Sequence, residues 1–97
     1  MVIACAARVE EDVLQILPTE PIPRLADEGR CRWETVLGYD YLLLYPDRLA
    51  LVVPKGTRDH LPAGDVRVSV ETAAGPTRFW TPPFETAYME RLEAIAV

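Results

Sequence analysis

Asparagine is absent from the sequence, and glutamine, serine, lysine and histidine each occur only once. Arginine outnumbers lysine nine to one, and nine residues are proline. Scarce thermolabile amides and proline-rich connections are typical of thermophilic proteins, so we expect a thermophilic source. The five glycines stand singly, which excludes a glycine-rich loop of the kind that cradles phosphate.

Long apolar runs are also missing, and no segment approaches the roughly 18 residues of a membrane span. The apolar residues 1–7 have no basic residue before them and are soon followed by Glu10-Glu11-Asp12, which argues against a signal peptide. The net charge is −5, so nucleic acid and anionic membranes do not fit as main partners unless the arginines gather on one face. We expect a single globular domain over residues 1–97, in the cytoplasm.

Cysteine is limited to Cys5 and Cys31, and His60 is the single histidine. These residues lack the CxxC or HxxxH spacing of metal sites, so we expect no metal and no cofactor. In a reducing cytosol the two cysteines would be buried thiols, whereas a thermophile could join them in a disulfide. Such a bridge would close a loop of about 26 residues and stabilise the fold by about 3 kcal/mol. Neither cysteine has a sequence context that activates a nucleophile.

Two segments have helical spacing. A short helix is predicted over residues 9–17, with the acidic triplet in its first turn and Pro18 at its end. Its apolar face consists of Val9, Val13, Ile16 and Leu17. Near the other end of the chain, Thr81 is a suitable N-cap and Pro82 suits the first turn of a second helix. The apolar stripe of this second helix consists of Phe84, Tyr88, Leu92 and Ile95.

Alternating or continuously apolar runs predict strands in the rest of the chain. These runs are residues 2–7, 30–37, 39–45, 49–53, 66–71 and 77–80. We therefore predict an α+β fold: a mostly antiparallel sheet of about six short strands, a short N-terminal helix, and an amphipathic C-terminal helix packed on one face. A strand-rich body closed by a terminal helix is also similar in outline to a pleckstrin-homology-like barrel, for which the sequence predicts one strand too few.

The segment Gly38–Pro54 predicts a hairpin that is apolar on both faces, whereas a half-exposed strand alternates apolar and polar residues. The predicted core residues of this hairpin are Tyr41, Leu43, Tyr45, Leu49 and Leu51. The opposite face is predicted to meet another protein chain, and its residues are Leu42, Leu44 and Val52, with Trp80 as an aromatic anchor. Burial of this second face inside the same chain is the alternative.

The loop over residues 54–64 carries the polar residues that favour a ligand site. Lys55, Arg58, Asp59 and His60 lie close together in sequence, and long loops on rigid scaffolds often carry function. An anionic ligand would suit this set. A general base needs a positioned partner, however, and no polar group from another segment is seen to converge on His60.

Two observations lead to the preferred hypothesis. Polar groups from different segments do not converge on a catalytic site, and the hairpin is apolar on both faces. The protein is expected to be a non-catalytic interaction module or accessory subunit, acting as a homo-oligomer or in a larger assembly. A small enzyme or anionic-ligand-binding protein that uses the 54–64 loop is the alternative. A nucleic-acid-associated protein is the third hypothesis.

Overall fold

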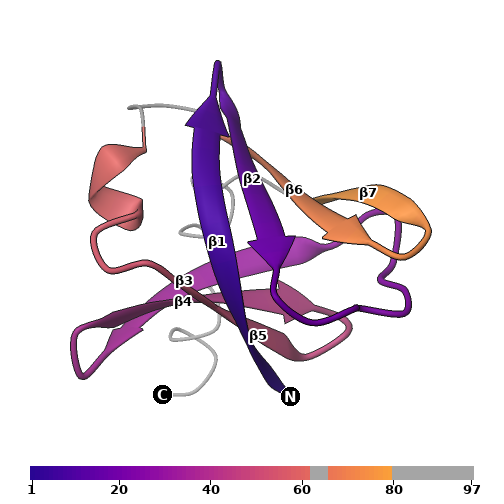
Figure 1. The fold of residues 1–97 in the computed structure, drawn as a ribbon, viewed down its shortest axis with the longest axis horizontal. Coiled ribbons are helices and arrows are strands. Elements are labelled where there is room, and N and C mark those ends of the chain that lie inside the picture. The colour runs from indigo at the N-terminus through magenta and orange to yellow at the C-terminus, as the bar shows by residue number, and fades with distance from the viewer. Residues whose placement is uncertain (62–65, 80–97) are drawn as a thin grey trace, which may run out of the picture.

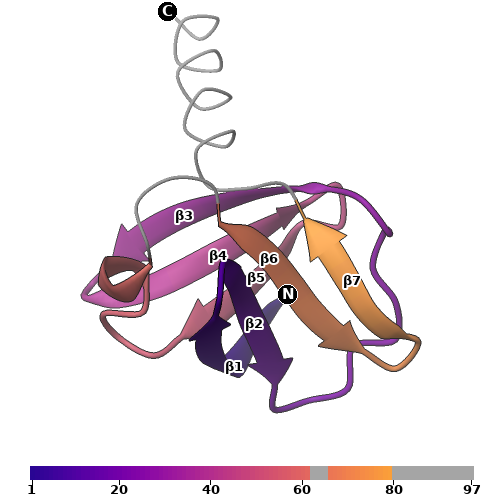
Figure 2. The same ribbon diagram turned by 90° about the horizontal axis from the view of Figure 1, so that it is seen from above.

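The computed structural model describes residues 1–61 and 66–79, which form one curled sheet of seven strands (Figures 1 and 2). The strands are β1 (Val2–Glu10), β2 (Val13–Pro18), β3 (Arg30–Val36), β4 (Tyr39–Tyr45), β5 (Leu49–Val53), β6 (Arg67–Thr72) and β7 (Gly75–Phe79). Within these ranges the one helical element is a single 3-10 turn, η1 (Arg58–His60).

The order across the sheet is β3-β4-β5-β1-β2-β6-β7, so β3 and β7 are the two edges. Four neighbouring pairs are antiparallel, but β1 pairs with β5 and β2 pairs with β6 in parallel. Strand β1 pairs with β5 over residues 2–4 and with β2 over residues 5–10. This change of partner along one strand lets the sheet curl into a half-barrel, and the inner face encloses the core (Figure 2).

The predicted α+β class is wrong, because the described part of the chain is built almost entirely of strands. The helix expected over residues 9–17 is instead a β-hairpin, and the acidic residues lie at its turn between β1 and β2. Leu14 and Ile16 are fully buried and alternate with less buried neighbours. A nine-residue helix is marginal on its own, whereas β2 gains a backbone partner on each side. The predicted C-terminal helix lies outside the described residues.

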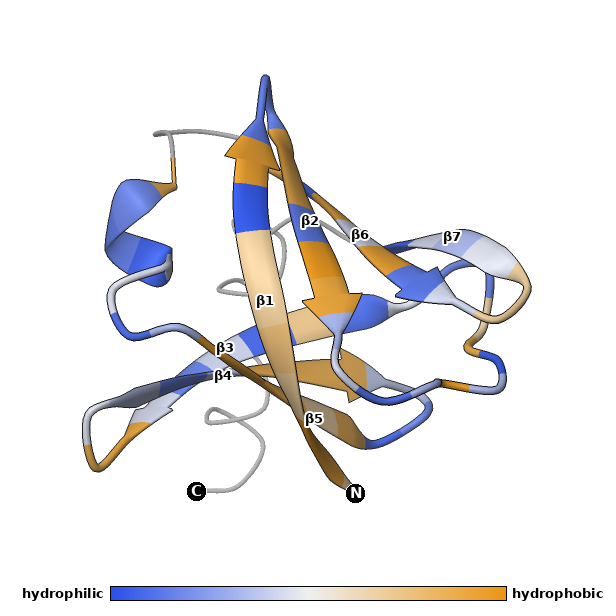
Figure 3. Ribbon diagram, in the orientation of Figure 1, coloured by the Kyte–Doolittle hydropathy of each residue, from blue (hydrophilic) through white to orange (hydrophobic). Residues whose placement is uncertain are grey.

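The core consists of apolar side chains from every strand and from the segment between β2 and β3 (Figure 3). Its members are Ile3, Cys5, Leu14, Ile16, Ile22, Leu25, Cys31, Leu42, Leu44, Leu49, Leu51, Val53, Val66, Val68, Val70 and Phe79. Ile22 and Leu25 belong to the proline-rich connector, which is held in place by Thr19 donating to the Ala4 carbonyl and by Ala73 donating to the Ile22 carbonyl. The connector is thus part of the packed structure.

Gly29 lies where the two edges of the sheet approach one another. A Cβ atom at this position would overlap the Tyr45 carbonyl oxygen and lie 2.7 Å from the Phe79 ring. Phe79 ends β7, and Tyr45 pairs with Arg30 at the start of β3. Glycine suits this position because the Tyr45 carbonyl and the Phe79 ring occupy the space that a larger side chain would need.

Candidate interaction surface and ligand site

The hairpin predicted within Gly38–Pro54 is confirmed as β4 and β5. The two faces of β4 are the reverse of the prediction, whereas Leu49 and Leu51 of β5 are buried as predicted. Leu42 pairs with Leu51, and Leu44 pairs with Leu49, on the inner face. Leu42, Leu44 and Leu51 are fully buried within the chain. Leu42 and Leu44 therefore belong to the core and are not available as interface residues.

The other face of β4 carries large side chains that remain partly exposed. On this face Tyr41 lies opposite Val52, and Leu43 lies opposite Ala50. We call this surface the tyrosine face and define it as Val36 of β3, Tyr39, Tyr41, Leu43 and Tyr45 of β4, Ala50 and Val52 of β5, and Val2 of β1. Tyr39 is 57% exposed, Val36 is 44% exposed and Val2 is 62% exposed. Val52 is the one predicted interface residue on this face, and Trp80 lies outside the described residues.

Three charged side chains of strand β3 border the tyrosine face, and the first of them, Arg30, lies opposite Tyr45. Arg32 lies opposite Leu43, and Glu34 lies opposite Tyr41. The Arg32 guanidinium donates to the Glu34 carboxylate across 3.4 Å, with both side chains partly exposed. The charged border thus carries two positive groups and one negative group, and the oppositely charged Arg32 and Glu34 lie side by side.

The β3–β4 hairpin ends in an apolar tip. Leu37 and Gly38 form its two-residue turn, with φ values of 52° and 80°, as a type I′ turn requires. Leu37 is 93% exposed and lies between the exposed pair Val36 and Tyr39. Three exposed apolar side chains therefore extend the tyrosine face to the end of the hairpin.

The loop that follows β5 is organised around Asp40, which sequence reasoning missed as a site residue. Asp40 lies on the inner face of β4 and is buried. One carboxylate oxygen accepts a hydrogen bond from the Thr35 hydroxyl at 3.0 Å. The other accepts from the backbone N–H groups of Gly56 at 3.2 Å and Arg58 at 3.4 Å. A polar residue at an inward position of an apolar strand was the available signal.

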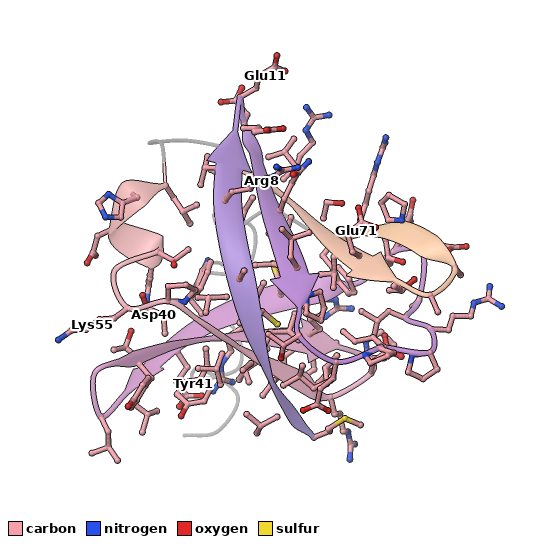
Figure 4. All side chains as sticks on the ribbon, viewed as in Figure 1. Arg8, Glu11, Asp40, Tyr41, Lys55 and Glu71 are labelled. Atoms are coloured by element: carbon pink, nitrogen blue, oxygen red, sulfur yellow. The ribbon has the colours of Figure 1, made fainter. Side chains whose placement is uncertain are left out.

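Asp40 fixes the predicted ligand loop and also limits what that loop can bind. A shallow depression of about 340 Å³ is lined by Thr35, Gly38, Asp40, Lys55, Gly56, Arg58 and Asp59. Lys55 extends outward beyond Asp40 (Figure 4). His60 lies in η1 and is not part of this lining, although its Nε2 would lie 3.9 Å from a Cβ atom on Gly56. The two loop N–H groups that would otherwise face an anion already donate to Asp40. The lining also has two acidic side chains, whose negative charge balances the positive charge of its two basic side chains.

A second depression of about 380 Å³ lies beside the proline-rich connector. Its lining consists of Leu17, Pro18, Thr19, Glu20, Pro21, Ile22, Glu71, Thr72 and Ala73. The lining has two carboxylates, no cation and no nucleophile beyond threonine hydroxyls, and both hydroxyls bond to backbone carbonyls. The arrangement offers no convergent catalytic group.

No disulfide joins Cys5 and Cys31, and both side chains are buried. They lie on β1 and β3, which are separated in the sheet by β5 and β4. Burial raises the pKa of the Cys5 thiol to about 11, so the thiolate that a nucleophile needs is disfavoured. The Cys5 Sγ lies 3.5 Å from the Ile3 carbonyl oxygen, to which it donates. Cys5 is thus a structural residue.

Histidine, cysteine and carboxylate side chains form no metal-binding group within residues 1–61 and 66–79. The same part of the chain has no helix with the length and apolar character to cross a membrane. No protein-family model, curated protein or solved structure matches the chain. Function must therefore be argued from the tyrosine face and the Asp40 loop alone.

Proposed function

We propose that this protein is a small, non-catalytic interaction module of the cytoplasm whose partner is a second copy of the same chain. The observation that carries the proposal is the row of Tyr39, Tyr41, Leu43 and Tyr45 along the outer face of β4, none of which is buried. Large apolar patches on a soluble protein mark interaction sites, and tyrosine is enriched in the centres of protein interfaces.

The charged border of the tyrosine face favours a second copy over an unrelated partner. Arg32 and Glu34 have opposite signs and lie two residues apart on the same face. A two-fold axis between two copies can place each of these groups beside its opposite. A partner surface of a single charge sign would be repelled by one of them.

Two further observations support a non-catalytic role in a reducing compartment. In the depression at the Asp40 loop, the Asp40 carboxylate already accepts hydrogen bonds from the Thr35 hydroxyl and from the backbone N–H groups of Gly56 and Arg58. The cysteines are buried and not disulfide-bonded, as is usual in the cytoplasm.

The test is the molar mass of the purified protein by light scattering across a range of micromolar concentrations. We expect association, and we expect Leu43→Arg to weaken it at least about tenfold because a charge would enter the tyrosine face. Leu17→Arg is the matched control, since Leu17 is also partly exposed but lies on β2 in the other half of the sheet. A wild-type protein that stays monomeric at all concentrations would refute the proposal.

A further inference from the structure

We propose that Leu37, at the tip of the β3–β4 hairpin, is an anchor residue of the contact between two copies of this chain, and that its presence there lowers the stability of the isolated chain. The proposal rests on the proposed function in requiring that copies associate. It adds to the contact surface a residue that lies outside the strands, and it predicts opposite effects on folding and on association.

The backbone of Leu37 is in a conformation that leucine rarely adopts. Its φ angle is 52°, in the left-handed region, where the Cβ atom lies too close to the following carbonyl oxygen. A type I′ turn requires a positive φ at both central residues, and asparagine, aspartate and glycine are the residues that accept it. Gly38 meets this requirement at the second position, but leucine does not meet it at the first. Leu37 therefore makes the turn less stable than asparagine or aspartate would.

The composition of the chain does not account for leucine at this position. Asparagine is absent from the sequence, but aspartate and glycine are both available. Within residues 1–61 and 66–79, two other non-glycine residues have a positive φ, and these are the exposed charged residues Glu11 and Arg48. Leu37 is the one apolar side chain in this set.

The side chain of Leu37 gains no packing that would offset this strain. It is 93% exposed, the largest exposed fraction among the large apolar side chains of the described residues. A single exposed leucine is ordinary at a protein surface. An exposed leucine in a left-handed turn is a different case, because its strained backbone is not balanced by burial. Strained positions of this kind are concentrated at sites that contact a ligand or partner.

The surroundings of Leu37 favour a second copy as this partner. Leu37 lies between Val36 and Tyr39, which pair across the hairpin and belong to the tyrosine face. The tip is therefore continuous with the surface that is proposed to meet the second copy. These three side chains carry no charge, so two copies do not repel one another there. The tyrosine face of the partner subunit supplies an apolar surface against which Leu37 is buried.

The test separates the two effects of Leu37 by substituting asparagine. Leu37→Asn gives the asparagine-glycine sequence that type I′ turns favour, so it should raise the midpoint temperature of unfolding of the monomer by about 4 °C. The same variant should weaken association at least about tenfold, because the apolar side chain is lost. Light scattering over a concentration series measures association, and thermal unfolding is recorded at a concentration where the wild type has the monomer mass.

Two further variants serve as controls. Glu11→Asn also places asparagine at a residue with a φ of 52°, in the turn between β1 and β2. Figure 4 shows Glu11 at the opposite end of the molecule from Tyr41 of the tyrosine face, so this variant should associate like the wild type. Leu37→Met keeps both the strained backbone and an apolar side chain, so it should match the wild type in both measurements.

The outcomes distinguish this proposal from the proposed function. A Leu37→Asn variant that unfolds at or below the wild-type temperature overturns the proposal, because the leucine would then stabilise its own chain. If the wild type associates and Leu43→Arg weakens association while Leu37→Asn does not, Leu37 is not an anchor and the proposed function stands. A monomeric wild type overturns both.

Discussion

Tyr41 and Leu42 are neighbours on β4, yet Leu42 is fully buried while Tyr41 lies on the outer face opposite Val52. This relationship separates the core of the protein from its proposed contact surface. Residues on the two faces of β4 should therefore respond differently to the same kind of substitution.

Leu42→Ala should lower the free energy of unfolding by about 2–5 kcal/mol, because it leaves a cavity in a closely packed core. Leu43→Ala should cost less, since its side chain is only partly buried on the outer face. Urea denaturation at low protein concentration would measure both effects without a contribution from association. Equal losses for the two variants would contradict the assignment of the faces.

Asp40→Ala should destabilise the protein by about 1–3 kcal/mol, because it leaves the Thr35 hydroxyl and two loop N–H groups without their acceptor. The backbone amides of Gly56 and Arg58 should also exchange faster with deuterium. Asp59→Ala is the control, since this exposed carboxylate should change stability by no more than about 0.5 kcal/mol. Unchanged amide exchange in Asp40→Ala would show that Asp40 does not hold the loop.

Gly29→Ala should cost about 1–3 kcal/mol, because the added methyl group would overlap the Tyr45 carbonyl and the Phe79 ring. Glu28→Ala tests the neighbouring exposed position and should be nearly neutral. Thermal unfolding followed by circular dichroism is sufficient for this comparison. A neutral Gly29→Ala would mean that the two edges of the sheet do not approach each other at this point.

Cys5 should react with thiol reagents only after unfolding, because burial raises its pKa to about 11. A thiol titration in denaturant should find both cysteines with or without prior reduction, since no disulfide joins them. The raised pKa also makes a pH-dependent contribution to stability. The folded state holds this proton more tightly than the unfolded chain, so the contribution is full below about pH 9 and is lost as the pH rises through 11. Rapid native labelling at neutral pH would contradict the burial.

The strands at β1, β3 and β6 and the hairpin of β4 and β5 were predictable from the sequence, because alternating or apolar runs are bounded there by glycine and proline. The β1–β2 hairpin was not predictable. Helical spacing fits the apolar residues Val9, Val13, Ile16 and Leu17. Residues 13–18 nevertheless form strand β2, because β2 pairs in parallel with β6, which is distant in sequence. Asp40 was missed because its donors come from Thr35 and from a loop beyond β5.

By itself the sequence determined that β4 and β5 form a hairpin with apolar side chains on both faces, because local turn chemistry and strand propensity require no distant contact. Which face is buried was decided only by the tertiary structure. A strand apolar on both faces has no preferred orientation until the sheet curls, and here the curl placed Leu42 and Leu44 inside and the tyrosines outside.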